Sequence, residues 1–189
     1  MDKKFVFTVD FEGDWGGRTN GTQGITDGLP LILEIFRSYS VKALFFISSE
    51  LALDNRGIIQ RILEKGHEIG SHGHFHIKYK DRWRSEQDRG ISERLLSIFT
   101  DKKLEYRAPK FSHEYEDSVY SRRKNHVSIL KYSWFGGGLP NHPIFYIHPF
   151  DIVEGKNAPN LFCKLLYSNP NHVYNTFVNL VRVYSQIEG

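Results

Sequence analysis

Short apolar runs alternate along this chain with longer segments in which apolar residues recur every three or four positions. The short runs are rich in β-branched and aromatic residues and stop at glycine, proline or charged residues, a pattern typical of buried strands. Strands are therefore predicted at residues 4–9, 42–47, 67–70, 104–111 and 143–147, and residues 127–134 fit a further one. The helical spacing predicts helices at residues 29–36, 58–63, 81–99, 161–166 and 173–184.

The first half of the chain reads strand, helix, strand, helix, strand, with short connections. This order is typical of a parallel sheet with right-handed crossovers, so an α/β fold is predicted. Thr26 or Asp27 is expected to cap the first helix with its side-chain oxygen. The residues expected to dock the helix at 81–99 are Ile91, Leu95, Leu96 and Ile98. No repeat or linker divides the sequence, which predicts one domain over residues 1–189.

Composition narrows the classes of function. A chain of 189 residues can bury a full core, and its single cysteine excludes an internal disulfide. The net charge of +3 comes from 25 basic and 22 acidic residues that are interspersed, which does not indicate a nucleic-acid-binding protein. No apolar run approaches the ~20 residues of a membrane span, and the first residues lack the apolar core of a signal peptide. We therefore expect a soluble cytoplasmic protein, while nothing indicates its oligomeric state.

Three carboxylates follow the first predicted strand at every second position, as Asp10, Glu12 and Asp14. Glycines follow at positions 16 and 17, so the strand is expected to open into a loop here. In α/β folds the carboxyl ends of strands are where catalytic groups tend to lie. A solvated acidic turn is the alternative interpretation.

Three histidines follow the third predicted strand within five residues, as His72, His74 and His76. On one turn of a helix His72 and His76 would share a face, whereas on a strand all three would point the same way. Either geometry brings imidazoles together, and neutral imidazoles favour a divalent metal, zinc above all. A solvated histidine-rich loop is the alternative interpretation.

Four segments in chain order now resemble the polysaccharide deacetylases of carbohydrate esterase family 4. They are Asp10-Phe11-Glu12, His72-Gly-His-Phe-His76, Arg107-Ala-Pro-Lys-Phe111 and Ile147-His148. The resemblance is greatest to the subgroup tied to exopolysaccharide and surface-glycan assembly. It implies a distorted, incomplete (β/α) barrel. It also implies a metal-dependent hydrolase that removes the N-acetyl group of an amino sugar in a glycan or a glycan precursor.

The resemblance implies a divalent metal, zinc by expectation, bound by Glu12, His72 and His76. Asp14 competes with Glu12 for the carboxylate position, because the family's usual adjacent Asp-Asp pair is replaced here by Asp10-x-Glu12. His74 is expected to face away from the metal. Three protein ligands leave an open position, the arrangement typical of catalytic zinc.

The resemblance also implies an acid and a base. Asp10 would be the general base, kept ionised by Arg107, and His148 would be the general acid. A backbone N–H near Phe111 would hold the oxyanion. No residue that orients His148 is identified from the sequence. Further residues expected to contact the sugar are Phe111, Trp15 and Trp134.

Two other functions remain open from the sequence. His72-x-His74-x-His76 also resembles the histidine-rich segment of polynuclear metal phosphoesterases, although that segment usually follows the first strand rather than the third. Alternatively, the domain binds a glycan or supports an assembly without activity. For the deacetylase, the expected substrate is an amino sugar on a nucleotide or lipid carrier, or in a glycan under assembly for the cell surface.

Overall fold

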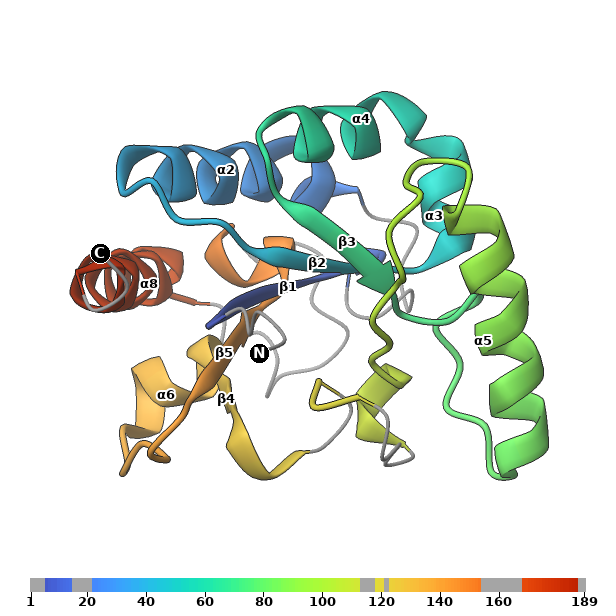
Figure 1. Cartoon of the computed structure of the whole chain (residues 1–189). Helices are drawn as coiled ribbons and strands as arrows, with labels where there is room; N and C mark the ends of the chain where they lie inside the picture. The colour runs from blue at the N-terminus through green and yellow to red at the C-terminus, as the bar shows by residue number, and fades with distance from the viewer. Residues whose placement is uncertain (1–5, 15–21, 113–117, 121–122, 154–167, 187–189) are drawn as a thin grey trace.

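The computed structural model describes residues 6–14, 22–112, 118–120, 123–153 and 168–186. Within them, five parallel strands form one sheet in the order β3-β2-β1-β5-β4 (Figure 1). In chain order the strands are β1 (Phe7–Phe11), β2 (Leu44–Ile47), β3 (Glu68–Ser71), β4 (His126–Ser128) and β5 (Ile144–Ile147). The predicted α/β fold with a parallel sheet is confirmed.

Helices flank this sheet (Figure 1). They are α2 (Leu29–Ser38), α3 (Ser49–Asp54), α4 (Arg56–Glu64), α5 (Arg82–Leu96), α6 (Ile129–Phe135) and α8 (Pro170–Ser185). Shorter turns are the π-helix η1 (Gly24–Gly28) and the 3₁₀ turns η2 (Pro109–Phe111), η3 (Arg123–Asn125) and η4 (Pro149–Ile152). Among the described residues, no helix has both the length and the apolar character that a membrane span requires.

An aromatic cluster joins the sheet to the helices that cover it. The rings of Phe7 and Phe145 stack at 5.4 Å on neighbouring strands, and Phe36 of α2 meets Phe177 of α8 edge-on at 5.4 Å. All four side chains are almost fully buried. Each such burial contributes roughly 1.5–3 kcal/mol, so this packing fixes the sheet on which the site is built.

The register of the sheet aligns the ends of its three first strands. Phe11 pairs with Ile47, and Ile47 pairs with Ser71, so the residues that follow β1 and β3 leave the sheet at one edge. On the other side of β1, Val9 pairs with Ile147 of β5. The carboxyl ends of β1, β3 and β5 therefore carry the chain into one region.

Two predicted strands differ from the structure. The segment 104–111 makes only an isolated bridge, between Tyr106 and Ser71, before Pro109 begins η2; proline has no N–H to continue a ladder. The segment 127–134 is a strand only to Ser128, whose hydroxyl then accepts a hydrogen bond from the Lys131 N–H at 3.4 Å. That cap begins α6 where the apolar pattern predicted a continuing strand.

The helix predicted at 81–99 exists as α5, but it buries a different face. Its buried residues are Ser85, Asp88, Ser92 and Leu96. Ile91 and Ile98 are exposed, the latter by 58%. Leu96 is buried as predicted, whereas Ile91 and Ile98 were wrongly expected to dock, because α5 packs through polar groups on β3 and the loop after it, where Ser92 meets Ser71 at 2.9 Å.

The predicted caps of the first helix are also wrong. The helix α2 begins at Leu29, after η1, and neither Thr26 nor Asp27 caps it. The carboxylate of Asp14 instead accepts the N–H groups of Gln23 at 2.8 Å and Gly24 at 2.9 Å. The helices predicted at 58–63 and 173–184 are confirmed as α4 and α8, and the one predicted at 161–166 lies outside the described residues.

The contact between η1 and η4 yields a stability prediction. A Cβ added at Gly28 would lie 1.8 Å from the carbonyl oxygen of Pro149, so the two turns would have to separate. We expect Gly28→Ala to lower the free energy of unfolding by about 1–3 kcal/mol, the usual cost of overpacking. Gly57→Ala in α4 is the matched control, because a Cβ there meets nothing within 4 Å. Urea titration of both variants checks this, and equal stabilities would contradict the close contact.

Candidate active site

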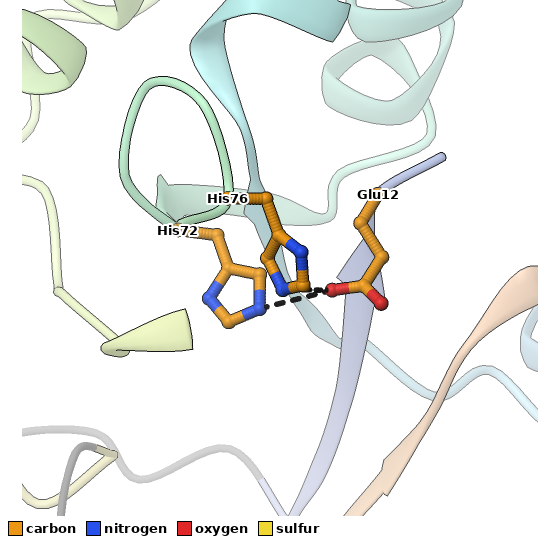
Figure 2. A group of neighbouring side chains, drawn as sticks. All are labelled: Glu12, His72 and His76. Atoms are coloured by element: carbon orange, nitrogen blue, oxygen red, sulfur yellow. Dashed lines mark ion pairs between the residues drawn. The ribbon is translucent and has the colours of Figure 1, made fainter. Parts of the chain in front are cut away.

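Glu12, His72 and His76 converge at the carboxyl edge of the sheet (Figure 2). Oε2 of Glu12 lies 2.5 Å from Nε2 of His76 and 3.3 Å from Nε2 of His72. The three side chains are between 2% and 8% exposed. The structure thus brings together the three residues predicted to bind a metal, and the cluster is shielded from bulk water.

The histidine segment is neither a helix nor a strand. Residues 72–76 form a loop in which Gly73 and His76 have positive φ angles of 79° and 53°. A left-handed conformation is natural for glycine but uncommon for other residues, and it persists where the surroundings hold it. These two turns reverse the chain, so that both imidazoles face Glu12. The sequence predicted the convergence but neither of the two geometries proposed for it.

The tautomer of His72 is set by its neighbour. Its Nδ1–H donates to the backbone carbonyl of Arg107 at 2.7 Å, which leaves Nε2 directed at Glu12 Oε2, 3.3 Å away. A neutral imidazole with Nδ1–H hydrogen-bonded to a carbonyl offers the Nε2 lone pair to a metal ion. The donor set, two imidazoles and one carboxylate, therefore fits a divalent metal ion.

Asp10 is held by a fully buried guanidinium. Nη1 of Arg107 pairs with Oδ1 of Asp10, Nη2 donates to Thr8 Oγ1 at 2.9 Å, and Nε donates to the Tyr120 carbonyl at 3.1 Å. Burial alone would raise the pKa of Asp10, but Arg107, His72 and His148 hold that pKa below its ordinary value. Its free oxygen, Oδ2, lies 3.9 Å from Nε2 of His72.

His148 reaches the same region from the end of β5. Its Nε2 lies 3.9 Å from Asp10 Oδ2 and 3.8 Å from Glu12 Oε1. Its Nδ1–H donates to Asp151 at 3.1 Å, and its backbone N–H donates to the same oxygen at 2.8 Å. Burial would lower the pKa of His148, but Asp151, Glu12 and Asp10 raise it to about 10.

Asp151 is the orienting residue that the sequence prediction lacked. It is fully buried and lies three residues after His148, in η4. The signal was present: an acidic residue at the third position of a helical turn reaches back to the N–H of the residue before the turn. Reading His148-Pro-Phe-Asp151 as such a turn would have found the pair.

Glu12 and Asp14, the two candidates for the metal carboxylate, have different neighbours. Asp14 is buried, but its two oxygens accept the N–H groups that precede η1, as described above. Glu12 stands beside the histidines instead. Burial would raise the pKa of Glu12, but His148, His72 and His76 hold it well below its ordinary value.

Other predicted residues have other neighbours. His74 turns away from the cluster and hydrogen-bonds through Nδ1 with Ser49 Oγ at 2.8 Å, as expected. The ring of Phe111 meets Tyr146 edge-on at 5.7 Å, and its N–H already donates to the Ala108 carbonyl at 3.0 Å. The oxyanion donor expected near Phe111 is therefore not the N–H of Phe111 itself.

The two tryptophans expected at the sugar site lack support from the structure. Trp15 lies outside the described residues. Trp134 of α6 packs edge-on against His172 of α8 at 5.4 Å. This contact joins two helices, so a role of Trp134 toward substrate stays a prediction.

Comparison with known proteins places these features in a family. The sequence pattern of the polysaccharide deacetylases matches residues 14–124, more than half of the chain. The match contains His72, His76 and Arg107, but it begins after Glu12 and ends before His148. The peptidoglycan-N-acetylglucosamine deacetylase PgdA of Listeria monocytogenes is 38% identical over 47 residues. Those residues are 25% of this chain, and the chain spans about a tenth of the length of that relative.

Solved structures of family 4 carbohydrate esterases share the fold. One is a pseudoenzyme from Bacillus anthracis, with 17% identity, a TM-score of 0.58, and coverage of 95% of this chain and 61% of that one. Another is a peptidoglycan N-acetylglucosamine deacetylase, with 15% identity, a TM-score of 0.59, and coverage of 97% and 84%. An esterase from Streptomyces lividans, in complex with acetate, has 10% identity, a TM-score of 0.54, and coverage of 94% and 89%. These likenesses concern the fold, and they confirm the deacetylase-type α/β fold.

The buried pair at β1 yields a prediction. Arg107→Met leaves Asp10 buried without its cation, so we expect the free energy of unfolding at pH 7 to fall by about 3–5 kcal/mol. Without the guanidinium, burial raises the pKa of Asp10 above that in the unfolded chain. The loss should therefore shrink as the pH falls toward ~4, where Asp10 takes up a proton. Denaturant unfolding of the metal-free protein at several pH values measures this.

Two further variants control that experiment. Arg82→Met removes an exposed pair with Glu86, 2.7 Å apart, and should cost at most about 1 kcal/mol. Adding Asp10→Asn to Arg107→Met should restore part of the lost stability, because position 10 then no longer carries a buried charge that has lost its guanidinium. A loss in Arg107→Met that does not change with pH would contradict this account.

Proposed function

The chain belongs to the polysaccharide deacetylase family. From this premise we propose that it is a metal-dependent hydrolase, which removes the N-acetyl group of an amino sugar in a glycan or glycan precursor. The observation that carries the proposal is the meeting of three groups of side chains at one edge of the sheet. These are the ligand cluster around Glu12, the carboxylate of Asp10 and the imidazole of His148.

Glu12, His72 and His76 would hold the metal, which we propose to be zinc. A divalent ion there supplies Lewis acidity toward the acetyl carbonyl and makes water a nucleophile near neutral pH. The electrostatics of the chain support this assignment. Glu12 is buried, and its carboxylate oxygens lie 2.5, 3.3 and 3.8 Å from imidazole nitrogens of His76, His72 and His148, so a divalent ion would compensate its charge.

Asp10 is suited to take the proton of the attacking water. The guanidinium of Arg107 binds Oδ1 and leaves Oδ2 directed at the cluster. Because the pKa of Asp10 is held low, the carboxylate is ionised at neutral pH and available as a base. The same contacts fix its orientation, which a base on a mobile side chain would lack.

His148 is suited to give a proton to the amine that leaves. Its Nδ1 is hydrogen-bonded to Asp151, so its Nε2–H is the proton directed at the site. The pKa of about 10 reflects the carboxylates of Asp151, Glu12 and Asp10 around the ring. A cation bound by Glu12 offsets one of these charges and lowers that pKa, toward the range in which an imidazolium transfers its proton readily.

We further propose that the substrate belongs to surface-glycan biosynthesis. The support is the resemblance of Tyr106-Arg-Ala-Pro109 and Phe145-Tyr-Ile-His148-Pro149 to the subgroup of deacetylases that act in exopolysaccharide assembly. We also take residues 1–189 as one catalytic domain. Acetate release from N-acetylated oligosaccharides, compared with N-formylated ones, tests the substrate class directly.

A non-catalytic glycan-binding domain is the second candidate. The observation that favours it is the Bacillus anthracis pseudoenzyme, which has the same fold; a mutant of that protein is described as having restored activity. A phosphoesterase with several metals has less support. Among the described residues one group of three metal-binding side chains is found, and His74 hydrogen-bonds with Ser49 instead of joining it.

Metal content provides the first test. We expect one divalent ion per chain, and its loss in the variant His72→Ala/His76→Ala, because a lone carboxylate cannot retain it. His74→Ala is the matched control and should keep full occupancy. Elemental analysis of the purified proteins measures this. Full occupancy in the double variant would refute the ligand assignment, and more than one ion per chain would favour the phosphoesterase.

Paired substrates test the acid and the base. Asp10→Asn should keep the metal and lose at least about 10²-fold in turnover on both an N-acetyl amide and an activated acetate ester. His148→Ala should lose a similar factor on the amide but far less on the ester, whose leaving group needs no proton. Steady-state rates on both substrates measure the difference. Equal losses for His148→Ala on the two substrates would mean that it is not the acid.

A further inference from the structure

Asp88 lies on the face of α5 where an apolar residue would be expected. Its side chain is buried, with 5% of the residue exposed. A buried carboxylate is costly unless hydrogen bonds satisfy it. The backbone N–H groups that donate to Asp88 come from the loop that carries the two proposed metal-binding histidines, 13 and 14 residues earlier in the chain.

The contacts of Asp88 fall between the two histidines and just after them. Oδ2 accepts the backbone N–H of His74 at 2.7 Å, and Oδ1 accepts that of Phe75 at 3.4 Å. The hydroxyl of Tyr79 donates to Oδ1 at 3.1 Å. A Cβ added at Gly73 would lie 2.5 Å from Oδ2, so this loop approaches the carboxylate as closely as glycine permits.

The two histidines differ in what holds their rings. His72 is fixed by its Nδ1–H, which donates to the Arg107 carbonyl at 2.7 Å. Nδ1 of His76 is buried and has no hydrogen-bond partner among the described residues. The position of the His76 ring therefore depends on the backbone before it, which includes the left-handed conformation of His76 itself.

We propose that Asp88 is a positioning residue that preorganises the loop of residues 72–76 so that His76 faces Glu12 and His72. By accepting the two N–H groups, its carboxylate stabilises a turn that the loop would otherwise leave for water-bonded conformations. The metal then binds a formed site and does not have to order the loop. This inference rests on the proposed function, since it concerns the affinity of the same metal site.

The test compares two buried residues of α5. Asp88→Ala removes both backbone contacts to the loop, whereas Ser92→Ala removes the hydrogen bond donated by Ser71 of β3 and touches the loop only through the 3.4 Å contact of Ser71 with the Gly73 N–H. Zinc dissociation constants are measured by competition with a chromophoric chelator, and the stability of each metal-free protein is measured by urea unfolding. We expect Asp88→Ala to raise the zinc dissociation constant by about 10–100-fold, the usual effect of losing a residue that supports a ligand. Ser92→Ala should change it by less than about threefold.

The isosteric variant Asp88→Asn carries the test if Asp88→Ala does not fold. Asparagine keeps one acceptor oxygen, so it can satisfy only one of the two N–H groups well and should weaken zinc binding by an intermediate factor. A visible spectrum of the cobalt-substituted protein gives a second readout, because its bands shift when the ligand geometry changes.

The outcomes separate the two proposals. If the unmodified protein binds zinc tightly and both Asp88 variants bind it equally well, the positioning role is overturned while the metal site stands. If Ser92→Ala weakens zinc as much as Asp88→Ala, the effect is general packing, and the positioning role is again overturned. If the unmodified protein binds no divalent metal, the proposed function fails, and the role of Asp88 toward a metal fails with it.

Discussion

Residue 107 connects Asp10 to the cluster of Glu12, His72 and His76, and much of the site depends on its burial. The guanidinium of Arg107 lies in the protein interior, over the ring of Phe46 at 4.2 Å, where a lone charge would be prohibitive. Asp10 supplies the compensating charge on the central strand. The backbone carbonyl of the same arginine accepts the Nδ1–H of His72. A shift of this one residue would therefore disturb Asp10, the proposed base, and His72, a proposed metal ligand, together.

The charges around Glu12 support the proposal of a bound cation. With Asp10 paired to Arg107, the buried carboxylate of Glu12 lies among the imidazoles of His72, His76 and His148. The carboxylates of Asp151, Glu12 and Asp10 favour the protonated form of His148, and its pKa is raised to about 10. A buried carboxylate without a cationic partner would be costly, so the surroundings of Glu12 support the proposed cation.

Much of the framework follows from local sequence, and the supporting contacts do not. Alternating apolar runs predict the strands, and strand ends predict where Asp10, Glu12, His72 and His148 come together. The contacts that support them, by contrast, cross the chain. Asp88 of α5 is buried because it accepts N–H groups of the loop at residues 72–76, and helical periodicity gives no information about that loop. The same periodicity wrongly placed Ile91 and Ile98 on the buried face of α5. The left-handed turn at His76 is likewise fixed by its surroundings rather than by residue type. Because a structure of this fold is known as a pseudoenzyme, activity has to be argued from these particular side chains.

The pairing of His148 with Asp151 has a further consequence for the robustness of the molecule. The two residues belong to one short turn and are separated by only two others, so little chain entropy is lost in bringing them together. An imidazole oriented by a remote segment would lose its partner whenever the two segments moved apart. Here, any sliding of β5 against its neighbours carries ring and carboxylate along as a single unit, so thermal motion of the sheet alters where the proton is presented but not which nitrogen bears it.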